Sequence, residues 1–253
     1  MTTMVQRASQ VVQTALRPLF TAAQRDGRRH QPLLNERSVE YAFVFSRLAT
    51  HGTGSLLDVG PGKSAFPVLA DLAGWRVVAV DNIVDFWRRG PLGVRWGLFN
   101  EHFLVEDADL TKSPPPPTFD VVTCISTFEH VIDREGLFRA MSMALRPGGE
   151  LLITTPYTED GGVPNAYDLP GSDAQGRTVP YVCRVLDRAE LTRLCAANGM
   201  QVQGMEYWRF WEGKHWSVGQ PLPRGQVSSA TEPHDLACIS LVKGGNEVHI
   251  HSR

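Results

Sequence analysis

The sequence predicts an α/β fold built on a mostly parallel sheet. Beyond residue 50, short apolar runs alternate with helical or irregular stretches, which is typical of parallel α/β proteins. The first of these runs leads directly into the glycine-rich turn Gly60-Pro61-Gly62. The chain has 253 residues, 42% of them hydrophobic and 21% charged, which suits a large globular domain. We therefore treat residues 1–253 as a single domain.

Seven strands and three helices are expected from the local patterns. The expected strands are residues 55–59, 77–80, 103–106, 119–126, 150–155, 201–207 and 236–242. Helices are expected over 65–72 and 133–145, the second ended by Pro147-Gly148-Gly149. Asp187 and Glu190 form a capping box, which predicts a third helix running to about Asn198.

The N-terminal region and the overall charge limit the classes of partner. Residues 1–50 are predicted to form a helical cover, because apolar side chains between Val11 and Phe20 recur at helical spacing. Arginines interrupt this region, and no apolar stretch approaches the length of a membrane span, so we expect no signal peptide and no membrane partner. A formal net charge of -2 gives no basic footprint for nucleic acid. The four cysteines form no C-x-x-C pair, which predicts reduced thiols in a cytoplasmic protein.

The stretch LLDVGPGKSAFP, residues 56–67, is compatible at first with three ligands. A P-loop for ATP needs a glycine five positions before Gly62, where Leu57 stands. A dinucleotide site fits the strand, the glycine turn and the later acid Asp81, but Asp58 would repel a pyrophosphate. S-adenosylmethionine carries an ammonium and a sulfonium and no phosphate, so the two acids favour it.

Residues 55–155 resemble class I S-adenosylmethionine-dependent methyltransferases. The resemblance lies in five segments in order, LLDVGPGKS, VVAVD, EDADL, FDVVTCISTFEHV and LRPGGELLITTP. It implies a Rossmann-like fold whose mostly parallel seven-stranded sheet has an antiparallel last strand and helices on both faces. It also implies a cofactor-binding core at 51–155, followed by acceptor-binding loops and C-terminal strands at 156–253.

The resemblance also implies which residues hold the cofactor. Gly60 and Gly62 would let the backbone approach it, and Asp58 would lie near its amino-acid end. Asp81 would accept both ribose hydroxyls. The adenine amine would meet Asp107 or Asp109, with the spacing to Phe119-Asp120 favouring Asp109. Further candidates are Pro61, Ser64, Asn82, Leu110 and Ser126. Ser64 replaces the family's third glycine and would either bind the cofactor carboxylate or cap the next helix.

Candidate catalytic residues follow the fourth expected strand. Transfer of a methyl group to a hydroxyl benefits from a base, and the unperturbed pKa of a histidine makes His130 suitable. The alternative is that His130 only orients the following helix. Glu129 would hold His130 or, with Asp160, ligate a divalent cation such as Mg²⁺, the alternative being a solvated acid at a helix start. His215 is a second catalytic candidate.

The acceptor region is expected in two later segments. Residues 155–182 form the longest irregular stretch, which is typical of a functional lid. The acceptor candidates are Tyr157, Asp160, Tyr167 and Asp168 here, and Trp208 and Trp211 in the aromatic segment 207–219. This mixture predicts O-methylation of a small molecule, preferably a sugar or oligosaccharide. A non-catalytic nucleotide-binding module and an NAD(P)-dependent oxidoreductase remain as alternatives, and a homodimer remains open.

Overall fold

The computed structural model describes residues 36–62, 64–88, 105–113, 116 and 118–244. The predicted helix around 11–20 and the first half of the predicted strand 103–106 lie outside these residues. The main elements are helices α2 (Glu36–His51), α3 (Phe66–Leu72), α5 (Arg134–Ala144) and α6 (Arg188–Asn198), and strands β1 (Ser55–Val59), β2 (Arg76–Asp81), β3 (Val105–Asp107), β4 (Phe119–Ile125), β5 (Leu145–Thr158), β6 (Leu186–Asp187), β7 (Met200–Trp211), β8 (Pro221–Ser228) and β9 (Leu236–Lys243).

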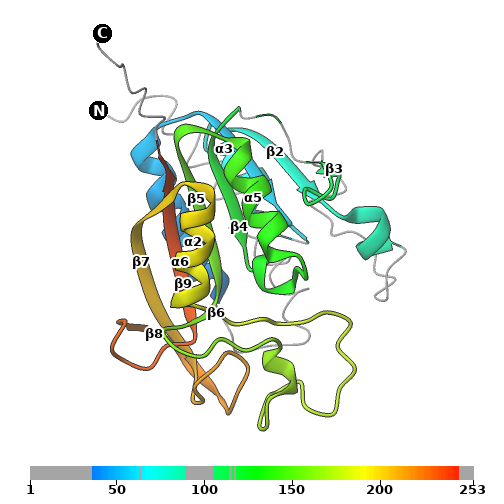
Figure 1. Cartoon of the computed structure of the whole chain (residues 1–253), viewed down its shortest axis with the longest axis vertical. Helices are drawn as coiled ribbons and strands as arrows, with labels where there is room; N and C mark the ends of the chain where they lie inside the picture. The colour runs from blue at the N-terminus through cyan, green and yellow to red at the C-terminus, as the bar shows by residue number, and fades with distance from the viewer. Residues whose placement is uncertain (1–35, 63, 89–104, 114–115, 117, 245–253) are drawn as a thin grey trace.

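One sheet organises these elements in the order β3-β2-β1-β4-β5-β9-β7-β8 (Figure 1). The five strands from β3 to β5 are parallel, whereas β9 runs antiparallel to both β5 and β7. The mostly parallel α/β sheet with an antiparallel last strand is therefore confirmed.

The described part of the sheet contains nine strands, two more than the sequence predicts. The short strand β6 pairs with the end of β5, and β8 forms a hairpin with β7. Strand β8 was missed because PLPRGQVS contains two prolines and a glycine, all depleted in strands. Proline is tolerated here because β8 is an edge strand, where its missing N–H costs no ladder hydrogen bond.

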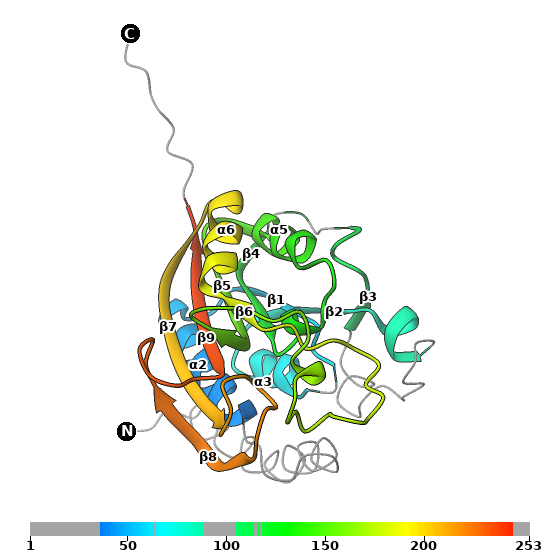
Figure 2. The same cartoon turned by 60° about the horizontal axis from the view of Figure 1, so that its bottom comes forward.

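Helices cover both faces of the sheet, as predicted (Figures 1 and 2). On one face, α5 and α6 pack on the sheet through a core that includes Leu137, Phe138 and Leu191. On the other face, α2 and α3 bury side chains such as Val44 and Phe66 against it. Helix α2 thus supplies the described part of the predicted N-terminal cover. None of the described helices has the length and apolarity needed to cross a membrane.

Local sequence signals explain the helix ends. The Asp187 carboxylate accepts the Glu190 N–H at 2.8 Å, and Gly199 closes α6 with a left-handed φ of 63°, so the predicted helix start at Asp187 is confirmed. The Glu190 carboxylate pairs with Arg134, so the reciprocal half of the capping box is replaced by an ion pair. Helix α5 ends at Ala144, and β5 begins at the next residue. The segment Pro147-Gly148-Gly149 therefore lies within the start of β5, beside a register shift with β4.

Helix α2 extends from the carboxyl ends of the parallel strands toward their amino ends. Its Glu40 contacts Thr154, which pairs with the end of β4, whereas its His51 contacts Glu150, near the start of the parallel β4–β5 pairing. The beginning of α2 therefore lies at the carboxyl ends of the parallel strands. In open α/β sheets this edge carries the ligand sites.

Candidate functional site

The glycine loop after β1 is held against the segment after β4. Gly60 and Gly62 have φ values of 71° and 54°, in the left-handed region that favours glycine. The Thr127 hydroxyl donates to the Gly60 carbonyl at 2.8 Å, and a Cβ on Gly60 would collide with the Thr127 side chain. The loop is therefore positioned by its own glycines and by the neighbouring segment. Pro61 is buried within it.

Asp58 is a buried carboxylate beneath this loop, with an exposed fraction of 2%. Its Oδ1 accepts the Thr123 hydroxyl at 2.7 Å, whereas its Oδ2 has no hydrogen-bond partner among the described residues. Burial raises the pKa of Asp58 to about 7, and the charge of Asp81 adds to this effect. A buried carboxylate with a free oxygen is suited to a cationic ligand and not to a phosphate.

Asp81 ends β2 and is connected to the glycine loop. Its Oδ2 accepts the Gly62 N–H at 2.9 Å, and its Oδ1 accepts the Asn82 N–H at 2.7 Å. Asp81 thus lies beside the loop, as the sequence predicts for a ribose-binding acid. A ligand hydroxyl would replace the Gly62 N–H or share the same oxygen with it.

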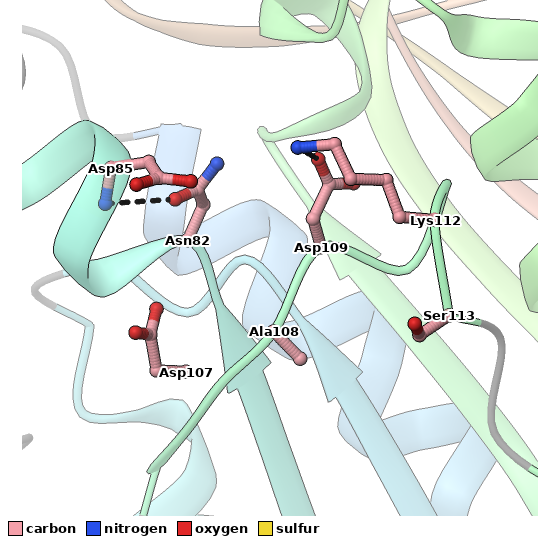
Figure 3. A pocket seen from close by; sticks show the side chains of 7 residues that line it. All are labelled: Asn82, Asp85, Asp107, Ala108, Asp109, Lys112 and Ser113. Carbon is pink, nitrogen blue, oxygen red and sulfur yellow. Dashed lines mark hydrogen bonds and ion pairs between the residues drawn. The ribbon is translucent and has the colours of Figure 1, made fainter.

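A hollow of about 340 Å³ opens beside the ends of β2 and β3 (Figure 3). The lining residues are Asn82, Asp85, Asp107, Ala108, Asp109, Lys112 and Ser113. Asp107 Oδ1 accepts the backbone N–H groups of Ile83 and Val84, while Asp109 binds the Thr111 hydroxyl at 2.6 Å and pairs with Lys112. Both adenine candidates therefore face the same hollow. Leu110, in contrast, is buried in the core behind it.

Two serine candidates for the cofactor site have structural partners. Ser64 Oγ accepts the Phe66 N–H at 3.3 Å, although α3 has Ala65 as its N-cap. Ser126 has a left-handed φ of 44° directly after β4, and its hydroxyl donates to Glu40 at 2.5 Å. Since Ser126 is not a glycine, this conformation is strained and must be held by its surroundings.

His130 lies in the short helix η2 (Phe128–His130) after β4, with about a third of its side chain exposed. Its Nδ1 lies 2.6 Å from the Val182 carbonyl, which can only accept, so Nδ1 carries the proton and Nε2 has a free lone pair. Burial lowers the pKa of His130 to about 4, which makes the ring neutral at physiological pH. The Tyr181 ring lies edge-on to it at 4.6 Å.

Glu129 points into the protein beside His130. Its Oε1 is 3.8 Å from His130 Nε2, and its Oε2 accepts the Thr155 hydroxyl at 3.4 Å. Burial raises the pKa of Glu129 to about 8, so this acid is mostly protonated at neutral pH. It is not a solvated acid at a helix start. Within the described residues, no group of three or more His, Cys, Asp or Glu side chains is arranged to hold a metal ion, so Glu129 and Asp160 do not form part of one.

Sequence reasoning missed a set of charged residues at the start of α2. Glu40 is fully buried, and Arg37 donates to its Oε2 at 3.1 Å. The Arg37 charge lowers the pKa of Asp58 and Glu129 against the larger, raising effect of burial, whereas for His130 it adds to the lowering effect of burial. The signal that could have found this set is an acid in the apolar stripe Glu40, Val44, Leu48 of the helix.

The acceptor candidates do not form one group. Tyr167 and Tyr181 are partly buried and lie edge-to-face at 6.1 Å, which connects Tyr167 to the His130 side of the molecule. Trp208 is partly buried, and Asp160 and Asp168 are exposed. Two candidates belong to the core instead, because Tyr157 is fully buried and Trp211, at 1% exposure, packs edge-on against Trp216. His215 lies in the turn between β7 and β8, outside the segment that carries His130.

Comparison with protein families shows which family this chain belongs to. Residues 27–203 match a family model described as a methyltransferase domain. This chain belongs to the methyltransferase family. It is an S-adenosylmethionine-dependent methyltransferase, which decides against the oxidoreductase and the non-catalytic module.

The relatives of the methyltransferase include ubiquinone biosynthesis O-methyltransferases. The protein of that name from Xanthomonas campestris is 27% identical over 224 residues, which cover 82% of this chain and 84% of the relative. A second, from Xanthomonas euvesicatoria, is 27% identical over 223 residues, with the same coverage of both chains.

Solved structures share the fold of the methyltransferase. The 1,6-didemethyltoxoflavin-N1-methyltransferase of Burkholderia thailandensis, solved with 1,6-didemethyltoxoflavin and S-adenosylhomocysteine, has a TM-score of 0.53 and 18% identity, covering 93% of this chain and 90% of that one. A putative sarcosine dimethylglycine methyltransferase of Galdieria sulphuraria has a TM-score of 0.54 and 13% identity, covering 82% and 86%. The Rossmann-like methyltransferase fold predicted from the sequence is thus confirmed.

Proposed function

We propose that this methyltransferase moves the methyl group of S-adenosylmethionine to a hydroxyl of a small molecule. The observation that carries the proposal is the buried Asp58, whose free Oδ2 lies beneath the glycine loop. An ammonium or sulfonium nearby would supply the charge partner that this carboxylate lacks. A pyrophosphate at the same place would meet like charge.

The residues around Asp58 fit the remaining parts of the cofactor. Asp81, as an ionised acceptor with two oxygens, would bind the ribose hydroxyls. The hollow lined by Asn82, Asp107 and Asp109 would take the adenine, and either acid could accept its amine. The positive φ values of Gly60 and Gly62 form the turn between these two groups, and the missing Cβ of Gly60 makes room for Thr127.

His130 is the base that we propose for the acceptor hydroxyl. The Val182 carbonyl fixes its tautomer and leaves Nε2 as the proton acceptor. Its pKa of about 4 keeps the ring neutral at every physiological pH, but it makes His130 a weaker base than the histidine of unperturbed pKa expected from the sequence. Glu129 Oε1 lies 3.8 Å from the same Nε2, which is longer than a hydrogen bond and leaves that lone pair open to the acceptor hydroxyl.

The acceptor is proposed to present its hydroxyl on a ring. The partly buried rings of Tyr167 and Tyr181, which lie edge-to-face at 6.1 Å on the His130 side of the molecule, offer a surface to such a ring. The name of the O-methyltransferase relatives supports oxygen as the methylated atom. The predicted preference for a sugar has less support, because Trp211, one of the two tryptophans on which it depended, is buried.

Two measurements test this proposal. Calorimetric titration should give binding of S-adenosylhomocysteine and none of NADH, whereas NADH binding alone would contradict the cofactor assignment. A screen with methyl-labelled cofactor should then compare phenols, sugars and amines as acceptors. Labelling of hydroxyl acceptors is the expected result, and labelling of amines alone would contradict O-methylation.

A further inference from the structure

The buried carboxylate of Glu40 connects three separate parts of the carboxyl edge of the sheet. Its Oε1 accepts the Ser126 hydroxyl at 2.5 Å and the Thr154 hydroxyl at 2.7 Å, and its Oε2 accepts Arg37 at 3.1 Å. Arg37 also donates to the Ile125 carbonyl at 3.3 Å. We call Arg37, Glu40, Ser126 and Thr154 the Glu40 network. It joins α2 to the ends of β4 and β5.

The network holds a backbone conformation that Ser126 would not adopt readily on its own. Ser126 has a φ of 44°, and a residue other than glycine keeps such a left-handed conformation only where its surroundings impose it. Here the Ser126 N–H donates to the Thr154 carbonyl and hydroxyl, and its side chain donates to Glu40. Glu40 therefore completes the set of bonds that fixes this residue.

Ser126 is followed directly by the residues proposed to bind and react. Thr127 bonds to the carbonyl of Gly60 in the cofactor loop, and Glu129 and His130 come two and three residues later. A displacement of Ser126 would move the Thr127 hydroxyl and thereby the glycine loop. The chain of contacts thus runs from α2 through Glu40, Ser126 and Thr127 to Gly60.

We infer that Glu40 is a positioning residue for methyl transfer, holding the segment after β4 so that the glycine loop and His130 keep the geometry that the cofactor and acceptor require. The inference rests on the function proposed above. Glu40 itself need not touch either ligand, since it acts through Ser126 and Thr127.

Glu150, on β5, provides a matched control because it contacts the same helix as the Glu40 network does. Glu150 is also buried, and it accepts hydrogen bonds from Arg47 at 2.8 Å and from Ser240 at 2.5 Å. It also pairs with His51, so these contacts connect α2 to β5 and β9 near the amino ends of the parallel strands. Replacing either acid by glutamine removes a buried charge that ties α2 to the sheet. Only the Glu40 replacement lies beside the proposed site.

The experiment compares Glu40→Gln and Glu150→Gln by thermal unfolding, by titration with S-adenosylhomocysteine and by hydrogen exchange. Both variants should unfold at a lower temperature. Glu40→Gln should raise the Kd for S-adenosylhomocysteine about tenfold, the order of one hydrogen bond to a charged group. It should also speed exchange in peptides covering residues 126–130. Glu150→Gln should leave the Kd within about twofold of wild type.

Equal Kd values for the two variants, with no change of exchange at 126–130, would overturn the inference. If Glu40→Gln does not fold, Thr154→Val, which removes one donor to Glu40 at constant shape, should raise the Kd in the same direction by about threefold. If the wild-type protein binds no S-adenosylhomocysteine, the proposed function fails. The exchange comparison then still decides whether Glu40 holds the segment after β4.

Discussion

At the residue scale, the site contains acids whose ionisation is opposed by burial. Asp58 and Glu129 have raised pKa values of about 7 and 8; Asp58 lies where a cationic cofactor is proposed to bind, and Glu129 lies beside the proposed base His130. Such a site lowers the stability of the free protein and favours binding of a cation, because an ionised buried acid is destabilising unless a positive charge lies beside it. Three expectations at this scale follow from the individual side chains.

Asp58→Asn should stabilise the free protein in a pH-dependent way. The folded pKa of Asp58, about 7, exceeds the ordinary 3.8, so wild type loses stability as pH rises from about 4 to about 7. The variant lacks this loss, and its advantage in the free energy of unfolding should reach about 4 kcal/mol above pH 7. Denaturant unfolding at pH 4, 6 and 8 measures it. An advantage that is equal at all three pH values would show that Asp58 ionises freely in the folded state.

Asp81→Ala should weaken binding of the cofactor product. Two hydrogen bonds from the ribose hydroxyls to one carboxylate contribute about 2–4 kcal/mol to the binding free energy. The net loss on mutation is smaller, because Asp81 already accepts a hydrogen bond from the Gly62 N–H in the free protein. Calorimetry with S-adenosylhomocysteine gives the affinity, and far-ultraviolet circular dichroism verifies folding. Asp71→Ala, at an exposed position of α3, serves as the control for general loss of charge. An unchanged affinity in a folded Asp81 variant removes Asp81 from the site.

His130→Ala should slow turnover without loss of cofactor affinity. General-base assistance typically contributes about 10²- to 10⁴-fold, and kcat should fall by such a factor. Because the pKa of His130 is lowered to about 4, wild-type kcat should decline only below about pH 5 and stay level through neutrality. Steady-state rates from pH 4 to 9, with an acceptor found in the screen, test both statements. A variant rate within about threefold of wild type would assign the base to another group.

At the element scale, the contact between the glycine loop and the segment after β4 sets the shape of the cofactor site. Gly60→Ala should be destabilising, because the added methyl meets Thr127 and the left-handed φ is strained for alanine. The expected loss is about 2–4 kcal/mol in the free energy of unfolding. Adding Thr127→Ser, which removes the colliding methyl but keeps the hydroxyl, should restore part of it. Chemical denaturation of the two single variants and the double variant measures the recovery. If the change in the free energy of unfolding of the double variant equals the sum of the changes in the two single variants, the two residues do not touch in solution.

At the scale of the whole molecule, the sequence predicted what depends on local pattern. The parallel strands, the helix N-cap at Asp187 and the glycine loop have short-range signatures and were found. Residues whose role depends on contacts with distant parts of the chain were not predicted correctly. Glu40 meets Ser126 only after the sheet has formed, and Trp211 and Tyr157 could not be assigned to the core from neighbouring letters alone. The assignment of His130 as a candidate could be made from its position, but its tautomer depends on Val182, 52 residues away.

The antiparallel strand β9 also has a consequence for synthesis on the ribosome. It is the last described strand in the chain, yet it lies inside the sheet between β5 and β7. Until β9 has emerged, nascent β5 and β7 have unpaired N–H and C=O groups, which other chains could pair with. The β7–β8 hairpin can therefore join the rest of the sheet only after β9 has been synthesised. A chain truncated before residue 236 should be digested quickly in limited proteolysis, whereas a released chain that includes residues 236–243 should resist the protease.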